Sequence, residues 1–217
     1  MTARDGGAEV LIRVELSEDV FDVAERSPDS RRMPQREVRE LLLLLDRYAA
    51  LRPQKGVIDE GSFLQLQDAA DFSEAVRLGL RLLSFGASTR RGLESKLCRK
   101  GVARETAAEA SAYLSEHGYI DEERDAVREA ERNVKKLRGR NRIRAVLCQK
   151  GYSPEAVDLA ERYLDEVDFT QLCKALIQKR YEGALSDASS RKRVVATLMR
   201  NGYTMREIRA AMTERSL

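Results

Sequence analysis

Few side chains of this chain could carry out covalent or acid–base chemistry. The 217 residues include one histidine, His117, and three cysteines, and their spacing matches no metal site. No GxxxxGK[ST] or GxGxxG segment is present to bind a phosphate. His117 precedes Gly118, so we interpret it as the end of a helix, where its charge favours the helix dipole. With the carboxylates expected on exposed acidic faces, the sequence predicts no enzyme, no metal site and no cofactor.

Arginine is the residue type that recurs at fixed intervals, and its chemistry is the binding of anions. Arg90, Arg140 and Arg191 each stand eleven residues before a glycine, at the expected start of a helix. A cation at the start of a helix opposes the helix dipole, so helix stability does not explain these arginines. Contact with an anionic partner does explain them.

A second set of arginines is predicted on the open face of the same helices. With about 100° per residue, Leu93 and Leu97 share one side of a helix and Arg99 lies on the opposite side. The predicted partner-binding residues are Arg90, Arg99, Arg140, Arg142, Arg191, Arg193 and Arg200. A charged helix face is most often simply solvated, and this alternative stays open for each residue. The threefold recurrence favours partner binding.

Charge is sorted along the chain. Basic residues outnumber acidic ones by six to one in 88–104, eight to none in 132–150 and six to one in 190–209. The intervening segments reverse this balance, with nine acidic and two basic residues in 105–131 and six acidic and one basic in 153–168. If the basic segments stack in register, they form one stripe. Such a stripe is typical of a protein that binds a polyanion or an acidic protein surface.

The elements that position these arginines repeat three times. Setting Gly101, Gly151 and Gly202 in register aligns apolar residues four and eight positions before each glycine. These residues are Leu97, Leu147 and Leu198, and Leu93, Ile143 and Val194. The spacing of four predicts a helix with one buried stripe, and a glycine in the left-handed conformation predicts its end.

Two further helices complete each unit. After the glycine, Ser153 with Pro154 is typical of a helix start, and Thr204 with Glu207 forms a capping box, whereas Ala103 is a weaker cap. The helix that precedes each pair is predicted to start at a capping aspartate, namely Asp71, Asp121 or Asp168. A unit of about 50 residues has little core of its own, so neighbouring units must stack.

The predicted fold class is therefore all-α, with three tandem three-helix repeats in an elongated curved stack. A small N-terminal extension with a β-hairpin and a helix precedes them. The predicted boundaries are 1–68 for the extension and 69–118, 119–167 and 168–217 for the repeats.

The extension has its own pattern. The segment VLIRVEL, residues 10–16, alternates apolar and charged side chains, which predicts a half-buried strand. Phe21 and Val23 are predicted to pair with it in a hairpin. The segment QREVRELLLLLDRYAAL, residues 35–51, is predicted to be a helix.

The cysteines are interpreted as reduced thiols. Cys98 and Cys148, with Met199 in the third unit, hold one register position beside a leucine, and we expect all three in the core. Cys173 stands alone on a helix. No apolar run reaches the roughly 18 residues of a membrane helix, and no signal-peptide segment opens the chain. We therefore expect a cytoplasmic protein with no membrane span.

Three segments resemble the RecX family of regulatory proteins. The first is FSEAVRLGLRLLSFGASTRRGLESKLCRKGV followed by GYIDEE, the second is GRNRIRAVLCQKGYSPEAV and the third is RKRVVATLMRNGYTMREIRAAM. The resemblance implies a curved helical stack that binds along the groove of the RecA filament on DNA. It also implies modulation, with inhibition expected, of the ATPase, strand-exchange and co-protease activities of RecA in DNA repair and the SOS response. The chain departs from the family at Gly92, where a charged residue is common.

Two other functions compete with this one. A sequence-specific DNA-binding protein could also present a basic helix, although a recognition helix is normally the last of its unit and here the last helices are acidic. A purely structural helical scaffold is the third class. The predicted partners are the RecA filament and, weakly through the basic stripe, single-stranded or duplex DNA, and the chain is expected to be a monomer.

Overall fold

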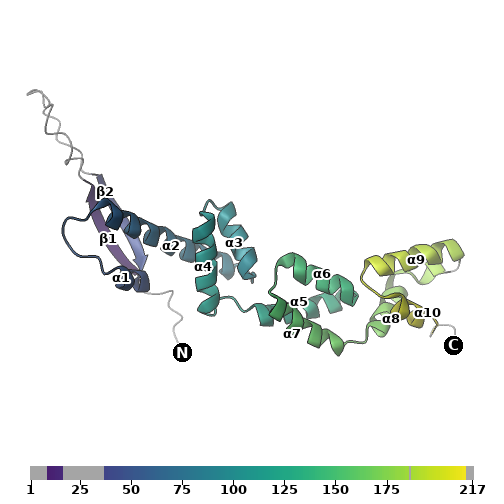
Figure 1. The fold of residues 1–217 in the computed structure, drawn as a ribbon. Helices are drawn as coiled ribbons and strands as arrows, with labels where there is room; N and C mark the ends of the chain where they lie inside the picture. Colours follow the sequence, from purple (N-terminus) through teal and green to yellow (C-terminus); the bar gives the residue numbers. More distant parts are fainter. Residues whose placement is uncertain (1–8, 17–36, 186, 214–217) are drawn as a thin grey trace, which may run out of the picture.

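The computed structural model describes residues 9–16, 37–185 and 187–213, which form an elongated helical stack with a two-stranded sheet at one end (Figure 1). The elements are β1 (Glu9–Leu16), β2 (Glu37–Leu44), α1 (Leu45–Leu51), α2 (Glu60–Ser84), α3 (Arg90–Arg99), α4 (Arg104–Glu116), α5 (Glu122–Lys135), α6 (Arg140–Lys150), α7 (Pro154–Asp165), α8 (Phe169–Arg180), a 3-10 turn η1 (Glu182–Leu185), α9 (Ala188–Arg200) and α10 (Met205–Thr213). The predicted fold class is confirmed. We call α2–α4 repeat 1, α5–α7 repeat 2 and α8–α10 repeat 3.

The extension differs from its prediction in one element. Strands β1 and β2 pair antiparallel, from Glu9 opposite Leu44 to Leu16 opposite Glu37, so the predicted helix over 35–51 is wrong in its first half. The leucine run of β2 has a helical propensity, but here it pairs with β1 and buries Leu43 against the start of α2. The predicted pairing of Phe21 and Val23 lies outside the described residues.

Helix α2 starts earlier than predicted. Asp59 caps it by accepting a hydrogen bond from the Ser62 N–H at 2.7 Å, and Asp71 lies exposed in the middle of the helix. No proline interrupts this segment, and Leu66 and Ala69 bury it against the hairpin. Asp71 is therefore not a cap, and α2 crosses the predicted boundary at residue 69.

The other predicted helix ends are confirmed except the start of α9, which lies at Ala188 after the capping Asp187, three residues before the predicted Arg191. Asp121 and Asp168 cap α5 and α8, Ser153 caps α7, and Thr204 with Glu207 forms the capping box of α10. Ala103 makes no capping hydrogen bond, and His117 ends α4. The three register glycines have φ values of 94°, 77° and 97° at Gly101, Gly151 and Gly202, which explains why glycine ends each of these helices.

The register leucines, isoleucine and valine are all buried, as predicted. Cys98 and Cys148 are exposed, and Met199 is 51% exposed, so their predicted core position is wrong. The reason is angular, because a residue five positions after Leu93 lies about 140° from the buried stripe. Cys173 is the buried thiol, and burial, followed by the charge of Glu207, raises its pKa to about 12.

The apolar core is divided. Repeats 2 and 3 share one cluster, which runs from Ala126 to Ala211, while repeat 1 forms a second cluster with Leu44 of β2. A third, small cluster joins the hairpin to the start of α2.

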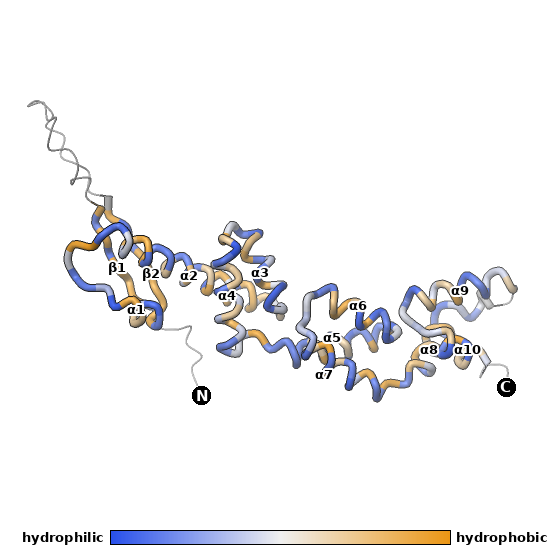
Figure 2. The backbone as a smooth tube through the Cα atoms, viewed as in Figure 1, coloured by the Kyte–Doolittle hydropathy of each residue, from blue (hydrophilic) through white to orange (hydrophobic). Residues whose placement is uncertain are grey.

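Hydrophilic and hydrophobic residues alternate along the helices (Figure 2). No described helix has the length and apolarity that a bilayer span requires.

Candidate partner-binding surface

The second helices of the three repeats, α3, α6 and α9, lie along the same long side of the stack (Figure 1). Each buries two residues of its apolar stripe in its own repeat, as Leu93 and Leu97 do in α3, and turns the opposite side outward. We call the outward sides of α3, α6 and α9 the basic face. Its cations therefore come from three separate segments of sequence that the repeat brings into line.

The three helices of the basic face meet end to end. At the junction of repeats 1 and 2, the Thr89 hydroxyl at the start of α3 donates to the Lys150 carbonyl at the end of α6, at 2.9 Å. At the junction of repeats 2 and 3, the Gly139 N–H at the start of α6 donates to the Asn201 carbonyl after α9, at 2.9 Å. Each contact joins polar groups that a helix end leaves unpaired. The basic face is thus one continuous row.

Two of the three register glycines, Gly151 and Gly202, take part in these contacts together with Gly139 before α6, whereas Gly101 has no neighbour within 4 Å of a Cβ position. A Cβ atom on Gly202 would lie 2.3 Å from the backbone nitrogen of Arg142, and one on Gly139 would lie 2.3 Å from the carbonyl carbon of Gly202. Both distances are too short for a side chain to fit. At Gly151 the corresponding contact is with Arg91, at 3.3 Å. Glycine therefore ends the helix and also lets the neighbouring repeat approach, a second role that the sequence did not reveal.

Four of the predicted arginines project from this face without a charged partner among the described residues, and Arg90 is exposed at the start of α3. Arg90, Arg142 and Arg193 form no ion pair within the described part of the chain. Arg99 donates to the Ser95 carbonyl at 3.2 Å, and Arg200 donates to the Thr197 hydroxyl at 3.1 Å. Neutral acceptors leave the guanidinium charge uncompensated, so these side chains can bind an anionic group.

Arg140 is placed differently. Its guanidinium contacts Asp165 at 2.6 Å and Glu161 at 3.9 Å, both on α7, and lies 5.6 Å from the ring centroid of Phe169 on α8. These contacts hold α6 to its own repeat and to repeat 3. The seventh residue, Arg191, is exposed and also interacts within the chain.

A buried ionic network was not predicted. Glu129 of α5 is 7% exposed, which corrects the expectation that the carboxylates lie on exposed faces. It contacts Lys150 Nζ at 2.8 Å and Arg132 Nη2 at 2.5 Å, and it accepts from Asn133 Nδ2 at 3.0 Å. Burial raises the pKa of Glu129, but hydrogen bonds from Lys150, Arg132 and Asn133 outweigh burial and lower it to about 2. In the sequence, the burial of Glu129 was indicated by its position between Ala126 and Ala130 on the buried stripe of this helix.

Glu122, from the GYIDEE segment, joins the first two repeats. Its Oε1 accepts from the Arg90 N–H at the start of α3, and its Oε2 accepts from the Ser153 N–H before α7, both at 2.7 Å. One carboxylate thereby binds backbone groups of both repeats. The sequence placed this residue in a characteristic segment but did not show its contacts.

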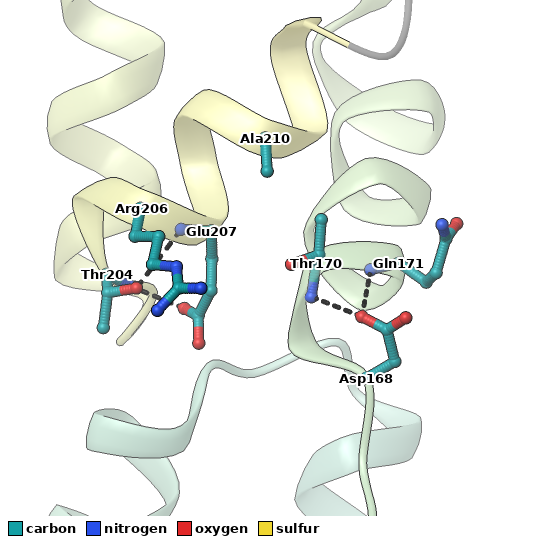
Figure 3. A pocket seen from close by; sticks show the side chains of 7 residues that line it. All are labelled: Asp168, Thr170, Gln171, Thr204, Arg206, Glu207 and Ala210. Atoms are coloured by element: carbon teal, nitrogen blue, oxygen red, sulfur yellow. Dashed lines mark hydrogen bonds between the residues drawn. The ribbon is translucent and has the colours of Figure 1, made fainter.

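A hollow between the starts of α8 and α10 is lined by polar residues (Figure 3). Asp168 accepts from the N–H groups of Thr170 and Gln171, and Thr204 and Glu207 bond each other. These polar groups cap helices, so they form no catalytic arrangement. Across the described part of the chain, no three His, Cys, Asp or Glu residues are grouped to hold a metal ion.

Stacked three-helix repeats that present a row of cations define a helical-repeat protein. No protein-family model matches the chain. The regulatory protein RecX of Chlorobaculum tepidum is 33% identical over 144 residues, which cover 65% of this chain and 88% of the relative. The regulatory protein RecX of Halorhodospira halophila is 34% identical over 149 residues, covering 67% and 91%. The chain therefore belongs to the RecX family of regulatory proteins.

Solved structures agree on the fold. A crystal structure of a regulatory protein RecX matches with a TM-score of 0.68 at 20% identity, over 85% of this chain and 95% of that chain. The crystal structure of RecX from Lactobacillus salivarius matches with a TM-score of 0.58 at 20% identity, over 67% and 97%.

Proposed function

We propose that this protein binds the RecA recombinase filament on DNA through the basic face and inhibits its ATP hydrolysis, strand exchange and co-protease activity. Family membership supports a regulatory role. The observation that carries the proposal is the end-to-end contact of α3, α6 and α9, which aligns free cations over the length of the stack. A linear row of cations suits a partner that repeats along an axis, such as a protein filament on a polyanion.

The proposed mechanism is occupation rather than catalysis. An elongated module that lies along a filament blocks the surface where a second DNA strand or a protein substrate would dock. Charge attraction guides the encounter, so binding should weaken as salt rises. We place this function in the cytoplasm and assign it to a monomer with repeats 2 and 3 at 119–167 and 168–217. The extension and repeat 1 then meet at the start of α2, Glu60, rather than at the expected boundary between 1–68 and 69–118.

The first experiment measures RecA ATP hydrolysis and strand exchange on single-stranded DNA with increasing amounts of this protein. We expect both rates to fall. Unchanged rates at a stoichiometric ratio would contradict the proposal. Unchanged rates combined with tight binding to one duplex sequence would favour the DNA-binding alternative, against which the acidic residues Glu155, Asp158 and Asp165 of α7 already argue.

The second experiment reverses charge on the basic face. The triple variant Arg142→Glu, Arg193→Glu and Arg200→Glu should lose inhibition at moderate salt. A matched control reverses three exposed arginines of α7 and α10, namely Arg162, Arg206 and Arg209. If both triple variants inhibit RecA equally, the basic face is not the contact surface.

A further inference from the structure

The junction of repeats 2 and 3 is closed by many contacts. Phe169 and Tyr203 of repeat 3 lie in the same apolar cluster as Ile143 of repeat 2. The Leu137 carbonyl accepts from both Asn201 Nδ2 and the Tyr203 hydroxyl, each at 3.0 Å. Together with the close approach of the two glycines, these contacts give repeats 2 and 3 a shared core and a closely packed junction.

The junction of repeats 1 and 2 has fewer contacts. Ile120, just before α5, is buried in the cluster of repeat 1 and Arg91 lies against Gly151, while the hydrogen bonds there come from Thr89 and Arg90. The apolar cluster of repeat 1 is separate from the cluster of repeats 2 and 3. Ala87, which corresponds in register to Leu137, is exposed. The Tyr152 hydroxyl, which corresponds to that of Tyr203, turns to the Asp125 carbonyl of its own repeat at 3.4 Å. Repeat 1 therefore rests on repeat 2 without a shared core.

Glu122 is central to this weaker junction. Among the described residues, two hydrogen bonds link the start of α3 to repeat 2: the Thr89 hydroxyl donates to the Lys150 carbonyl, and the Arg90 N–H donates to Glu122. The same carboxylate holds the Ser153 N–H of repeat 2. Loss of the Glu122 side chain would leave the start of α3 bonded to repeat 2 through Thr89 alone among the described hydrogen bonds, while repeat 1 stays folded around Leu93 and Leu97.

We propose that the junction of repeats 1 and 2 is a hinge and that Glu122 is its latch, a positioning residue that sets the angle between α3 and the rigid pair α6 and α9. When Glu122 releases the Arg90 N–H, the α3 part of the basic face rotates relative to the rest. The face can then follow partners of different curvature. The use of the hinge in partner binding rests on the proposed function, whereas the hinge itself does not.

The native thiols provide a direct measurement. Cys98 on α3 and Cys148 on α6 are exposed, while Cys173 is buried, so spin labels attach to one site on each side of the junction. Distances between the two labels, measured by pulsed electron resonance on the full chain, report the α3–α6 angle. A second protein with Cys98→Ser and Met199→Cys carries labels on α6 and α9 and reports the closed junction.

With Glu122 present, we expect the Cys98–Cys148 distances to be more widely distributed than the distances between labels at Cys148 and at position 199, which cross the junction of repeats 2 and 3. Glu122→Ala should roughly double the width of the first distribution and leave the second unchanged. Amide hydrogen exchange at Arg90 and Ser153 should become about tenfold faster, because one charged acceptor is lost from each. Glu123→Ala, at the exposed neighbouring residue, is the control and should change none of these.

The hinge would be overturned if the two distance distributions had equal widths and if Glu122→Ala changed neither of them. Equal broadening at both junctions would also overturn it, because that result indicates general loosening. Glu122→Gln, which keeps an oxygen acceptor, should give an intermediate width and separates the latch from loss of folding. The proposed function fails independently, through unchanged RecA activity with the distance distributions as expected.

Discussion

Repeats 2 and 3 place different residues at one equivalent buried position, eight residues after the aspartate that caps their first helix. Repeat 2 has Glu129 there, held by Lys150 and Arg132. Repeat 3 has Leu176, packed in the shared apolar cluster. The same three-helix unit is thus held by an ionic network in one repeat and by apolar packing in the next.

This difference changes how the charge of the chain is interpreted. Repeat 2 has the most basic segment of the sequence, yet much of that charge is engaged inside the repeat. The side chains paired with carboxylates are Arg132, Arg140, Arg144 and Lys150. On α9, Arg193 and Arg200 face no carboxylate among the described residues. Counting basic residues therefore overstates what repeat 2 offers to an anionic partner.

The strongest test of this comparison puts a carboxylate into repeat 3. In Leu176→Glu the new carboxylate would have Lys179 where repeat 2 has Arg132, but the neutral Asn201 at the register position of Lys150, so it would be buried with one of the two cations missing. We expect a loss of about 4 kcal/mol in the free energy of unfolding, measured by urea denaturation. Gln171→Glu, on the exposed side of α8, is the control and should change stability little. Equal losses in the two variants would show that the position is not specifically apolar.

The converse test removes the carboxylate from repeat 2. Glu129→Ala leaves Lys150 and Arg132 without their buried partner, and we expect a loss of about 3 kcal/mol by the same measurement. Combining Glu129→Leu with Lys150→Asn imitates repeat 3, which has Leu176 and Asn201 at these positions, and should recover most of that loss, because apolar packing can replace a buried carboxylate and its ion pairs. The comparison fails if the double variant is no more stable than Glu129→Ala.

Acid should distinguish the two repeats through Glu129. Its pKa falls from 4.5 to about 2 in the fold, so its contribution is complete above the unfolded pKa and is lost as pH falls from about 4.5 toward 2. The expected loss is about 2 kcal/mol, measured as unfolding free energy at several pH values. In Glu129→Gln this part of the pH dependence should disappear, and its persistence would assign the effect to other carboxylates.

The smallest expected effect compares two arginines of the basic face. Arg140→Ala breaks contacts with Asp165 and Phe169, so we expect a loss of about 1 kcal/mol in unfolding free energy. Arg193→Ala breaks no ion pair and should stay within about 0.5 kcal/mol. Its effect should instead be seen in partner binding, as a weaker salt dependence. Equal stability losses would mean that Arg140 is not a structural residue.

Periodicity made the repeat region predictable. Leu93, Ile143 and Val194 recur at the same distance before a glycine, and a pattern that repeats three times identifies the buried stripe without any structure. The basic face followed from the same register. Its individual contacts did not, because Arg140 and Arg142 look alike in sequence and differ only in what α7 and α8 bring near them.

Two kinds of prediction from the sequence were wrong, and each failed for a physical reason. The run Leu41–Leu44 forms a strand because β1 pairs with it, a long-range contact that local propensity does not contain. Recurrence at Cys98, Cys148 and Met199 was interpreted as burial, although their helical angle put them outside the stripe. Recurrence shows that a position is equivalent between repeats, whereas only the angle shows which way it faces.

Helix α6 contacts a neighbouring repeat at each end, with its start on the turn after α9 and its end against the start of α3. The length of α6 therefore sets the distance between the first and third repeats. Its 11 residues at about 1.5 Å each give a helix about 16 Å long. A variant with one additional helical turn would shift the arginines of α3 and α9 apart by about 5 Å. The spacing of charge along the molecule is thus set by the length of a single helix.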